Sequence, residues 1–355
     1  MKMDLQGKNI VLIGGAGFIG HNLALEFKTR GAQVEIIDSL QINNLGAFAA
    51  NVDNIPDRPL YLHLIHERLN ILHEAGIPLH TVDARDYQSL SPLLGSINPQ
   101  VVVHLAAIAH ASKANKSPYS TFDHNLRTLE NALDATRDYV EHFIYLSSSM
   151  VYGNFQSDQV GEETVCEPVG IYGALKYSGE KLVIGYNQVF DVPYTIVRPS
   201  ALYGERCVSR RVGQVFIEQA MKGLVLNIHG DGEDRLDFTY VQDFIDGMVR
   251  IISNKNSRNE IFNLTYGTSR SISEMVDIIK TEFGDIGIQY LPKDDLMPDR
   301  GTLSIEKAKR LLGYEPRYPL ESGFVKYIRW YNTLVEQHRH LFDDVKPSLK
   351  LVKGC

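Results

Sequence analysis

Tyr172 and Lys176 are four positions apart, a spacing that places a phenol and an ammonium group on one face of a helix. A phenol with an ordinary pKa of about 10 is a poor base near neutral pH. A unit positive charge about 4 Å away is worth roughly 4 kcal/mol at an effective dielectric constant near 20, which would bring that pKa close to neutrality. We therefore expect Lys176 to make Tyr172 a group that can take up and return a proton.

The surroundings of this pair matter, because a Tyr-x-x-x-Lys pattern alone is common. Residues 143–146 form a short apolar run that predicts a buried strand, and Ser147, Ser148 and Ser149 follow it. A serine hydroxyl at the end of that strand could polarise the same substrate oxygen that Tyr172 acts on. The three residue types together predict acid–base catalysis.

Glycines follow the first apolar run of the chain, residues 10–13, and precede a helical pattern. Gly14, Gly17 and Gly20 would allow a tight turn, close approach of the backbone to a pyrophosphate, and close contact between helix and strand. The phosphates would lie at the positive end of the helix dipole. We expect a dinucleotide-binding loop here rather than a plain turn.

Two acidic residues could complete this site. Asp38 ends the second predicted strand, residues 33–37, where it would accept hydrogen bonds from the ribose hydroxyls of adenosine. Residues 39–44 contain no Lys or Arg to hold a 2′-phosphate, so the sequence favours NAD over NADP. Asp83 follows a third predicted strand and could meet the adenine amino group. A loop-capping role is the alternative for Asp38, and a helix N-cap is an almost equally good account of Asp83.

The elements that would position these residues alternate between strands and helices. Short apolar runs over residues 10–13, 33–37, 101–103, 143–146 and 194–197 predict strands buried on both faces. We expect an α/β fold, a Rossmann-type doubly wound parallel sheet, with a smaller α/β C-terminal substrate domain. The predicted NAD-binding domain comprises residues 1–199 and 238–264, and the substrate domain comprises residues 200–237 and 265–340. Residues 60–76 predict an additional amphipathic helix, and residues 341–355 a tail.

Composition excludes several classes of protein. The 355 residues carry a net charge of −7, so a basic nucleic-acid footprint is absent. No apolar run approaches the roughly 20 residues that cross a bilayer. The three cysteines are too few and scattered for a disulfide framework, and the twelve histidines show no metal-ligand spacing. We expect a cytoplasmic protein without a metal site, a membrane segment or a nucleic-acid partner.

These motifs resemble the extended short-chain dehydrogenase/reductase family, in particular its NAD-dependent sugar-nucleotide epimerases and dehydratases. The resemblance runs from about residue 8 to about residue 335, and it includes residues 104–107, Asn125, and residues 147–153, 198–204, 237–243 and 311–316. It implies that Tyr172 is the base, that Lys176 also holds the nicotinamide ribose, and that Ser148 is the catalytic hydroxyl, with Ser149 as its nearest rival. Further cofactor contacts are expected from Phe18, Ile19, Ala84, Leu105, Ala106 and Ala107.

The resemblance also narrows the reaction. The similar dehydratases carry an Asp-Glu pair after the catalytic hydroxyl, and the decarboxylating members carry a Glu at the second of these positions. Ser149 and Met150 stand there in this chain, and neither shuttles a proton near neutral pH. The remaining chemistry is 4-epimerisation: Tyr172 removes the C4 hydroxyl proton while hydride passes to NAD, the 4-keto sugar turns over, and hydride returns to the other face.

Two alternatives stay open. A 4-keto-sugar reductase, or an epimerase acting at another carbon, could use the same residues, and would differ in whether NADH must be supplied. An NAD-binding sensor or scaffold protein is the alternative from another class, although such a protein has no need of the catalytic residues.

The substrate is expected to be a nucleoside-diphosphate sugar. The insertion between Asp38 and Asp83 makes the chain resemble UDP-glucuronate 4-epimerases more than the shorter UDP-glucose enzymes. Two positions depart from that pattern: Ser112 lies near the place of an arginine common in the uronate enzymes, and Ala201 replaces an asparagine that contacts the diphosphate in many members. Relatives commonly pair through two sheet-covering helices, so we also expect a homodimer.

Cations for the diphosphate would come from the second domain. Arg211, Arg235 and Arg300 are the favoured substrate-binding arginines, together with Ser149 near the sugar. Planar guanidinium groups suit phosphate oxygens. Arg206 and Arg210 are weaker candidates, for which a surface salt bridge is an equally good account.

Overall fold

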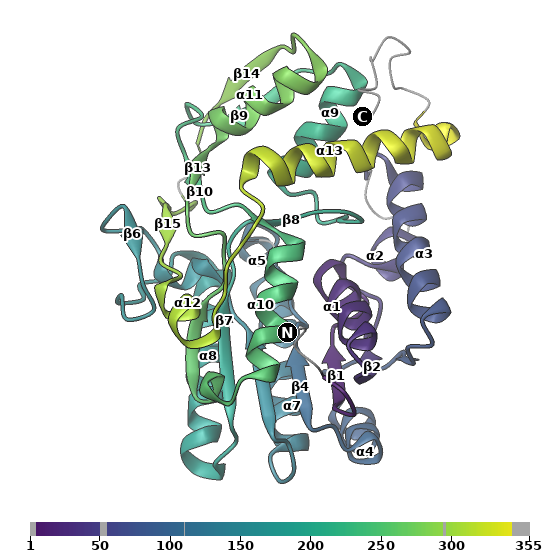
Figure 1. Ribbon diagram of the computed structural model, residues 1–355, viewed down its shortest axis with the longest axis vertical. Helices are drawn as coiled ribbons and strands as arrows, with labels where there is room; N and C mark the ends of the chain where they lie inside the picture. The colour runs from purple at the N-terminus through teal and green to yellow at the C-terminus, as the bar shows by residue number, and fades with distance from the viewer. Residues whose placement is uncertain (1–4, 50–54, 110, 294–295, 343–355) are drawn as a thin grey trace.

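A seven-stranded parallel sheet lies at the centre of the structure, a computed structural model that describes residues 5–49, 55–109, 111–293 and 296–342. The strand order is β12-β7-β5-β4-β1-β2-β3 (Figure 1). The strands are β1 (Asn9–Ile13), β2 (Gln33–Ile37), β3 (Leu79–His80), β4 (Val101–His104), β5 (His142–Leu146), β7 (Tyr194–Arg198) and β12 (Glu260–Asn263). The predicted Rossmann-type, doubly wound α/β fold is therefore confirmed.

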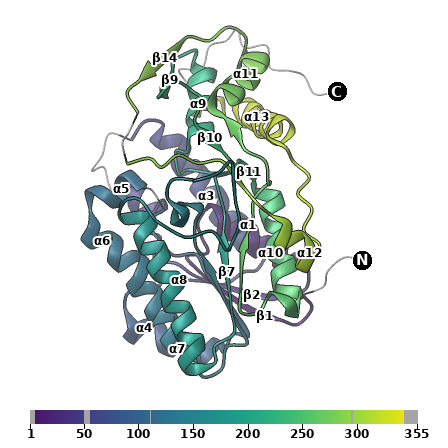
Figure 2. The same cartoon turned by 90° about the vertical axis from the view of Figure 1, so that its left-hand side faces the viewer.

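Alternate residues of the buried strands face two different layers of helices. Ile10 and Leu12 belong to the core beneath α1 (Phe18–Thr29) and α10 (Val241–Ser253). Val11 and Ile13 belong to the core beneath α4 (Tyr87–Ile97), α7 (Thr128–Thr136) and α8 (Gly170–Phe190). Figure 2 shows the two layers on opposite sides of the sheet. Burial on both faces explains why these strands are apolar throughout.

The second half of the chain builds a smaller region, seen at the upper end of Figure 1. Its helices are α9 (Val212–Lys222), α11 (Ile272–Phe283) and α13 (Leu320–Gln337). Its paired strands are β9 (Leu226–His229) with β14 (Ile288–Leu291), and β10 (Arg235–Leu236) with β13 (Arg270–Ser271). Strand β12 leaves this region and joins the central sheet beside β7, as the sequence predicted.

Helix α3 (Arg58–Glu74) is the additional helix that the sequence predicted over residues 60–76. Its buried side chains are those of Leu60, Tyr61, Leu64, Ile65, Arg68 and Leu72. The helical spacing of Leu62, Ile65, Leu69 and Leu72 predicts a buried stripe, but Leu62 and Leu69 are only half-buried, so the buried face is rotated from that stripe. The helix packs on α1 and on α2 (Leu45–Ala49), and the Tyr61 hydroxyl donates to Glu218 of α9 at 2.6 Å. It thereby ties the two regions together.

Short elements complete the described chain. They are α5 (Ala111–Lys116), α6 (Pro118–Phe122), a π-helix (Asp123–Arg127), three 3₁₀ helices (Ser149–Tyr152, Lys255–Ser257 and Arg339–Leu341), β6 (Gln159–Val160), β8 (Leu202–Tyr203), β11 (Thr239–Tyr240), β15 (Thr302–Leu303) and α12 (Glu306–Leu312). None of the helices in the described ranges is long and apolar enough to cross a membrane. Most of the predicted tail lies outside the described residues.

Candidate active site

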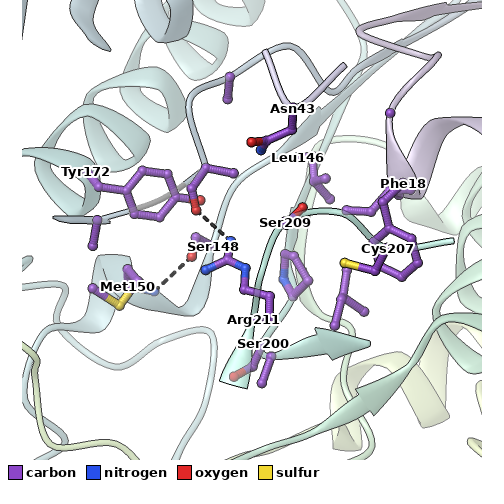
Figure 3. Close-up of a pocket in the computed structure, with 18 of the residues that line it drawn as sticks. Phe18, Asn43, Leu146, Ser148, Met150, Tyr172, Ser200, Cys207, Ser209 and Arg211 are labelled. Carbon is purple, nitrogen blue, oxygen red and sulfur yellow. Dashed lines mark hydrogen bonds between the residues drawn. The ribbon is translucent and has the colours of Figure 1, made fainter. Parts of the chain in front are cut away.

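A cavity of about 730 Å³ opens at the carboxyl ends of β1, β2, β4 and β5, where the strand order reverses between β1 and β4. It is lined by every residue that the sequence predicted for the site: Gly14, Gly17, Phe18, Ile19, Gly20, Asp38, Asp83, Ala84, Leu105, Ala106, Ala107, Ser148, Ser149, Tyr172, Lys176, Arg211, Arg235 and Arg300. The fold thus brings these separate motifs to one place. Figure 3 shows the part of the cavity around Tyr172.

Tyr172 and Ser148 meet where α8 crosses the end of β5. The Ser148 hydroxyl accepts a hydrogen bond from the Met150 backbone N–H at 3.2 Å and caps the 3₁₀ helix that begins at Ser149. The same hydroxyl shares a hydrogen bond with the Tyr172 phenol. Helix α8 approaches closely because Gly173 has no Cβ, which would lie 2.7 Å from the Met150 carbonyl oxygen. The two hydroxyls are therefore placed to act on one substrate oxygen.

Lys176 is held by the backbone at the end of β5. Its ammonium donates to the Leu146 carbonyl oxygen at 2.7 Å and lies 5.0 Å from the Tyr145 ring centroid. Burial lowers the pKa of Lys176 to about 7, against the opposing charge of Glu180. Burial raises the pKa of Tyr172, and the influences that lower it are the charge of Arg211 and the Ser148 hydrogen bond. The effect of the lysine charge on the phenol therefore stays a prediction.

Arg211 lies at the Tyr172 end of the cavity. It is the N-cap residue of α9, and its Nη2 donates to the Ala109 carbonyl oxygen at 2.6 Å. Figure 3 shows its side chain beside Ser148 and directed toward the loop that borders Tyr172. The sequence associated Arg211 with the diphosphate, whereas this position brings its charge close to the Ser148 and Tyr172 hydroxyls.

The glycine loop has the shape that a dinucleotide requires. Gly14 has a φ of +79°, and a Cβ there would lie 2.6 Å from the Ala106 backbone nitrogen. A Cβ on Gly20 would collide with the Gly15 carbonyl oxygen, so α1 can begin directly against the turn. Gly17 has more space, since a Cβ there would lie 3.6 Å from the Gly14 carbonyl oxygen. A pyrophosphate can therefore approach the backbone at the N-terminus of α1, and these residues fit NAD.

Gly14→Ala is expected to abolish retention of NAD by the purified protein, because the added methyl group must displace the loop after β4. Gly7→Ala is the matched control, since Gly7 has a similar φ of +75° but no atom within 4 Å of its Cβ position. Both variants lose roughly 1–2 kcal/mol from the positive φ alone. The measurement is the NAD content and melting temperature of each variant. Equal NAD content in both variants would contradict this account of the loop.

Asp38 holds the loop and still faces the cavity. Its carboxylate accepts from the Ala16 N–H at 3.0 Å and from the Leu40 N–H at 2.7 Å. Burial raises the pKa of Asp38, and the two hydrogen bonds oppose this effect. The loop-capping alternative is thus also realised, and the lone pairs that remain can accept hydrogen bonds from a ribose.

Asp83 is held by an arginine two positions along the chain. The Arg85 guanidinium donates to both carboxylate oxygens, with the shortest contact at 2.5 Å, and lowers the pKa of Asp83. The N-cap of α4 is Asp86, whose carboxylate accepts from the N–H groups of the first turn. The helix-cap alternative for Asp83 is therefore wrong, and its contact with adenine remains a prediction.

The three arginines that the sequence favoured for substrate binding differ in whether their side chains already have hydrogen-bond or carboxylate partners. The Arg300 Nε is buried without a hydrogen-bond partner among the described residues. Burial, together with the nearby charge of Arg211, lowers the pKa of Arg300 to about 10. Arg235 donates to the Ser269 carbonyl oxygen at 2.9 Å and lies 3.4 Å from a Glu274 oxygen. Arg300 and Arg211 are thus like charges sharing one cavity, an arrangement that favours an anionic ligand.

The two weaker candidates for diphosphate binding, Arg206 and Arg210, also differ from each other in their surroundings. Arg206 forms a salt bridge with Glu67 of α3 at 2.7 Å, which is the alternative that the sequence analysis left open. Arg210 is exposed and lines the cavity.

The sequence analysis did not predict a buried ion pair between Arg198 and Glu180, which lies on the same helix as Tyr172. Glu180 lies one helical repeat beyond Lys176, and its carboxylate accepts from Arg198 at 2.6 and 2.9 Å. The Ser147 hydroxyl donates to the same carboxylate at 2.5 Å. This network fixes the end of β5 against α8, so it positions Ser148 relative to Tyr172. The spacing of Tyr172, Lys176 and Glu180 along one helix face was the available signal.

Asn125 has a comparable positioning role on the other side of the cavity. Its side-chain oxygen accepts from the Ile108 N–H at 2.8 Å, although the two residues are far apart in sequence. It is buried within the π-helix Asp123–Arg127. This bond fixes the loop after β4, which carries the Leu105 to Ala107 segment of the cavity wall.

Comparison with known proteins agrees with this site. The NAD dependent epimerase/dehydratase family model matches residues 10–265. The chain is 30% identical to the uncharacterized UDP-glucose epimerase YtcB of Bacillus subtilis, covering 92% of this chain and 99% of that protein. It is 25% identical to a dTDP-glucose 4,6-dehydratase of Xanthomonas campestris, covering 91% and 93% of the two chains. The UDP-glucuronic acid 4-epimerase of Bacillus cereus, solved with UDP-glucuronic acid and NAD, is 27% identical and superimposes with a TM-score of 0.80, covering 92% and 99%.

The family match covers most of the chain, and it includes the glycine loop, Ser148, Tyr172 and Lys176. The predicted resemblance and the predicted NAD cofactor are thereby confirmed. We conclude that the chain is an NAD-dependent enzyme and belongs to the NAD-dependent epimerase/dehydratase family.

Proposed function

We propose that the protein inverts C4 of a nucleoside-diphosphate sugar, with UDP-glucuronate or a related UDP-hexose as the favoured substrate. The observation that carries this proposal is the pair of residues after the catalytic hydroxyl. Ser149 and Met150 are buried at the cavity wall, where the dehydratases that the chain resembles carry an acid and a base. Elimination of water therefore lacks its proton-transfer groups at this place.

The residues at the end of β5 suffice for oxidation and reduction at one carbon. Bound NAD supplies the chemistry of accepting a hydride and giving it back. Tyr172 takes the proton of the C4 hydroxyl and later returns it. Ser148 orients the phenol and donates to the substrate oxygen, while the Leu146 carbonyl oxygen holds the Lys176 ammonium near the cofactor side of the cavity. The 4-keto sugar then presents its other face before it is reduced.

Two features support a uronate substrate. Helix α3 gives the chain the insertion expected of the longer enzymes. Arg211 places a guanidinium near Tyr172 and Ser148, where a carboxylate on the sugar could pair with it. We also infer that the region formed by residues 200–237 and 265–340 binds the sugar nucleotide, because Arg211, Arg235 and Arg300 all reach the cavity from it.

The direct test is to incubate the purified protein, without added cofactor, with UDP-glucuronate, UDP-glucose and the corresponding N-acetylated sugars. Proton NMR is expected to show the C4 epimer of at least one of them, with NAD already bound. Formation of a 4-keto-6-deoxy sugar would support a dehydratase instead. A strict requirement for NADH would support the reductase, and bound NAD without any turnover would support the sensor or scaffold protein.

A further inference from the structure

Arg68 is a fully buried arginine on the insertion helix α3, with 0% of its side chain exposed. Its Nε donates to the Arg206 carbonyl oxygen at 2.9 Å. Both Nη groups are buried and have no hydrogen-bond partner among the described residues. A buried guanidinium without a paired carboxylate is unfavourable for the folded state. No carboxylate among the described residues lies at hydrogen-bond distance from the Nη groups of Arg68, so its positive charge has no directly paired negative charge.

The surroundings of Arg68 place it behind the cofactor loop. Its charge lowers the pKa values of His21 on α1 and of Asp38 at the end of β2, both of which are shifted most by burial. The His21 Nδ1 lies 3.0 Å from the carbonyl oxygen of Gly17, the residue that begins α1. The Cys207 side chain, which also interacts electrostatically with Arg68, lies beside Phe18 on the cavity wall (Figure 3). The Arg206 carbonyl oxygen that Arg68 contacts belongs to the residue before Cys207, so Arg68 lies close to the first turn of α1.

The cofactor loop itself carries no positive side chain. Residues 14–20 are Gly, Gly, Ala, Gly, Phe, Ile and Gly, and the first turn of α1 contains no charged residue. Backbone N–H groups and the helix dipole would be the anion-binding groups of this turn. A buried cation near that turn would add to them with little screening by solvent.

We propose that Arg68 provides the fixed positive charge that stabilises the pyrophosphate of NAD, acting from behind the first turn of α1. The insertion helix α3 would then belong to the cofactor site as well as to the contact between the two regions. Arg68 is a positioning residue in this account, because it acts through the electrostatic field at the loop and is not part of the cavity wall. The inference depends on the NAD site and not on the choice of sugar or reaction.

The test compares ligands with and without phosphate. The full-length chain, freed of bound nucleotide, is titrated calorimetrically with ADP-ribose and with adenosine. Arg68→Met is expected to weaken ADP-ribose binding roughly tenfold to thirtyfold, as for the loss of one buried charge that acts without direct contact. Adenosine binding should weaken by clearly less, about threefold at most, because adenosine has no pyrophosphate and is affected by Arg68 only through Asp38. The melting temperature of the nucleotide-free variant should be unchanged or higher, since an unpaired buried charge is removed.

Controls separate this role from a structural one. Arg68→Lys should retain most of the ADP-ribose affinity. Arg206→Gln removes a charge at the same contact, but that charge is already paired with Glu67, so binding should be unchanged. If Arg68→Met does not fold, Arg68→Gln carries the same expectation. An ADP-ribose affinity that is unchanged, or that falls together with adenosine affinity and melting temperature, would overturn the proposal.

Discussion

Tyr172→Phe is expected to lower turnover about a thousandfold, within the range that general acid–base catalysis contributes. The phenol is the group that the end of β5 and helix α8 place against the Ser148 hydroxyl. Phenylalanine fills the same space, so the cavity and the NAD content should be preserved. The measurement is kcat on the sugar that the NMR assay identifies, together with the NAD content of the purified variant.

Tyr177→Phe is the matched control for this variant. Tyr177 lies on the same helix, α8, and packs in a separate cluster with Val151 and Tyr152. Removal of the Tyr177 hydroxyl should change kcat by less than about threefold relative to the unaltered enzyme, because this residue lies away from the site. Comparable activity of Tyr172→Phe and the unaltered enzyme would remove Tyr172 from the mechanism.

Arg211→Gln is expected to lower kcat/KM for UDP-glucuronate roughly thirtyfold, the value of a hydrogen bond to a charged group. Measured on the pH-independent plateau of each profile, where Tyr172 is deprotonated in both enzymes, the loss for UDP-glucose should be much smaller, because that sugar has no carboxylate to pair with the guanidinium. Arg210→Gln is the control, since Arg210 is the exposed neighbour that also lines the cavity. Equal losses for the two sugars would instead support the diphosphate role that the sequence predicted for Arg211.

The same variant should shift the pH dependence of the reaction. The base must be deprotonated to act, so activity rises with pH toward the pKa of Tyr172. The charge of Arg211 lowers that pKa, against the effect of burial. Its removal raises the pKa, and the rising limb of the kcat/KM profile is expected to move to higher pH. A limb that stays in place would show that the charge does not reach the phenol.

The sequence predicted the central sheet of this protein well, because most of its strands are short runs of apolar residues. β4, β5 and β7 are buried throughout and β1 nearly so, and each stands out as a short apolar run, whereas β2 alternates between buried and more exposed residues. The glycine loop and Asp38 follow from their positions after the first and second strands. The third predicted strand is present before Asp83 as β3, which has only the two residues Leu79–His80.

The positions of long side chains were harder to predict from the sequence. The spacing of Tyr172 and Lys176 fixes a helix face, but the lysine side chain extends to the Leu146 carbonyl oxygen. Arg211, which follows the Tyr203-Gly204 turn, could not be assigned to either end of the cavity from the sequence, because that assignment requires the course of the loop that leads to α9. Arg68 escaped notice because a charged residue on an amphipathic helix is normally taken to face solvent, whereas the helix is rotated so that this position is buried.

Retention of a C4 deuterium label tests the central claim most directly. UDP-glucuronate deuterated at C4, or whichever sugar proves active, is converted by the purified enzyme in ordinary water without added cofactor, and the product is examined by NMR. The account predicts inversion at C4 with the deuterium still on that carbon, because the label leaves as hydride to the bound cofactor and returns from it. Release of the label to water, or inversion at a different carbon with C4 untouched, would contradict it.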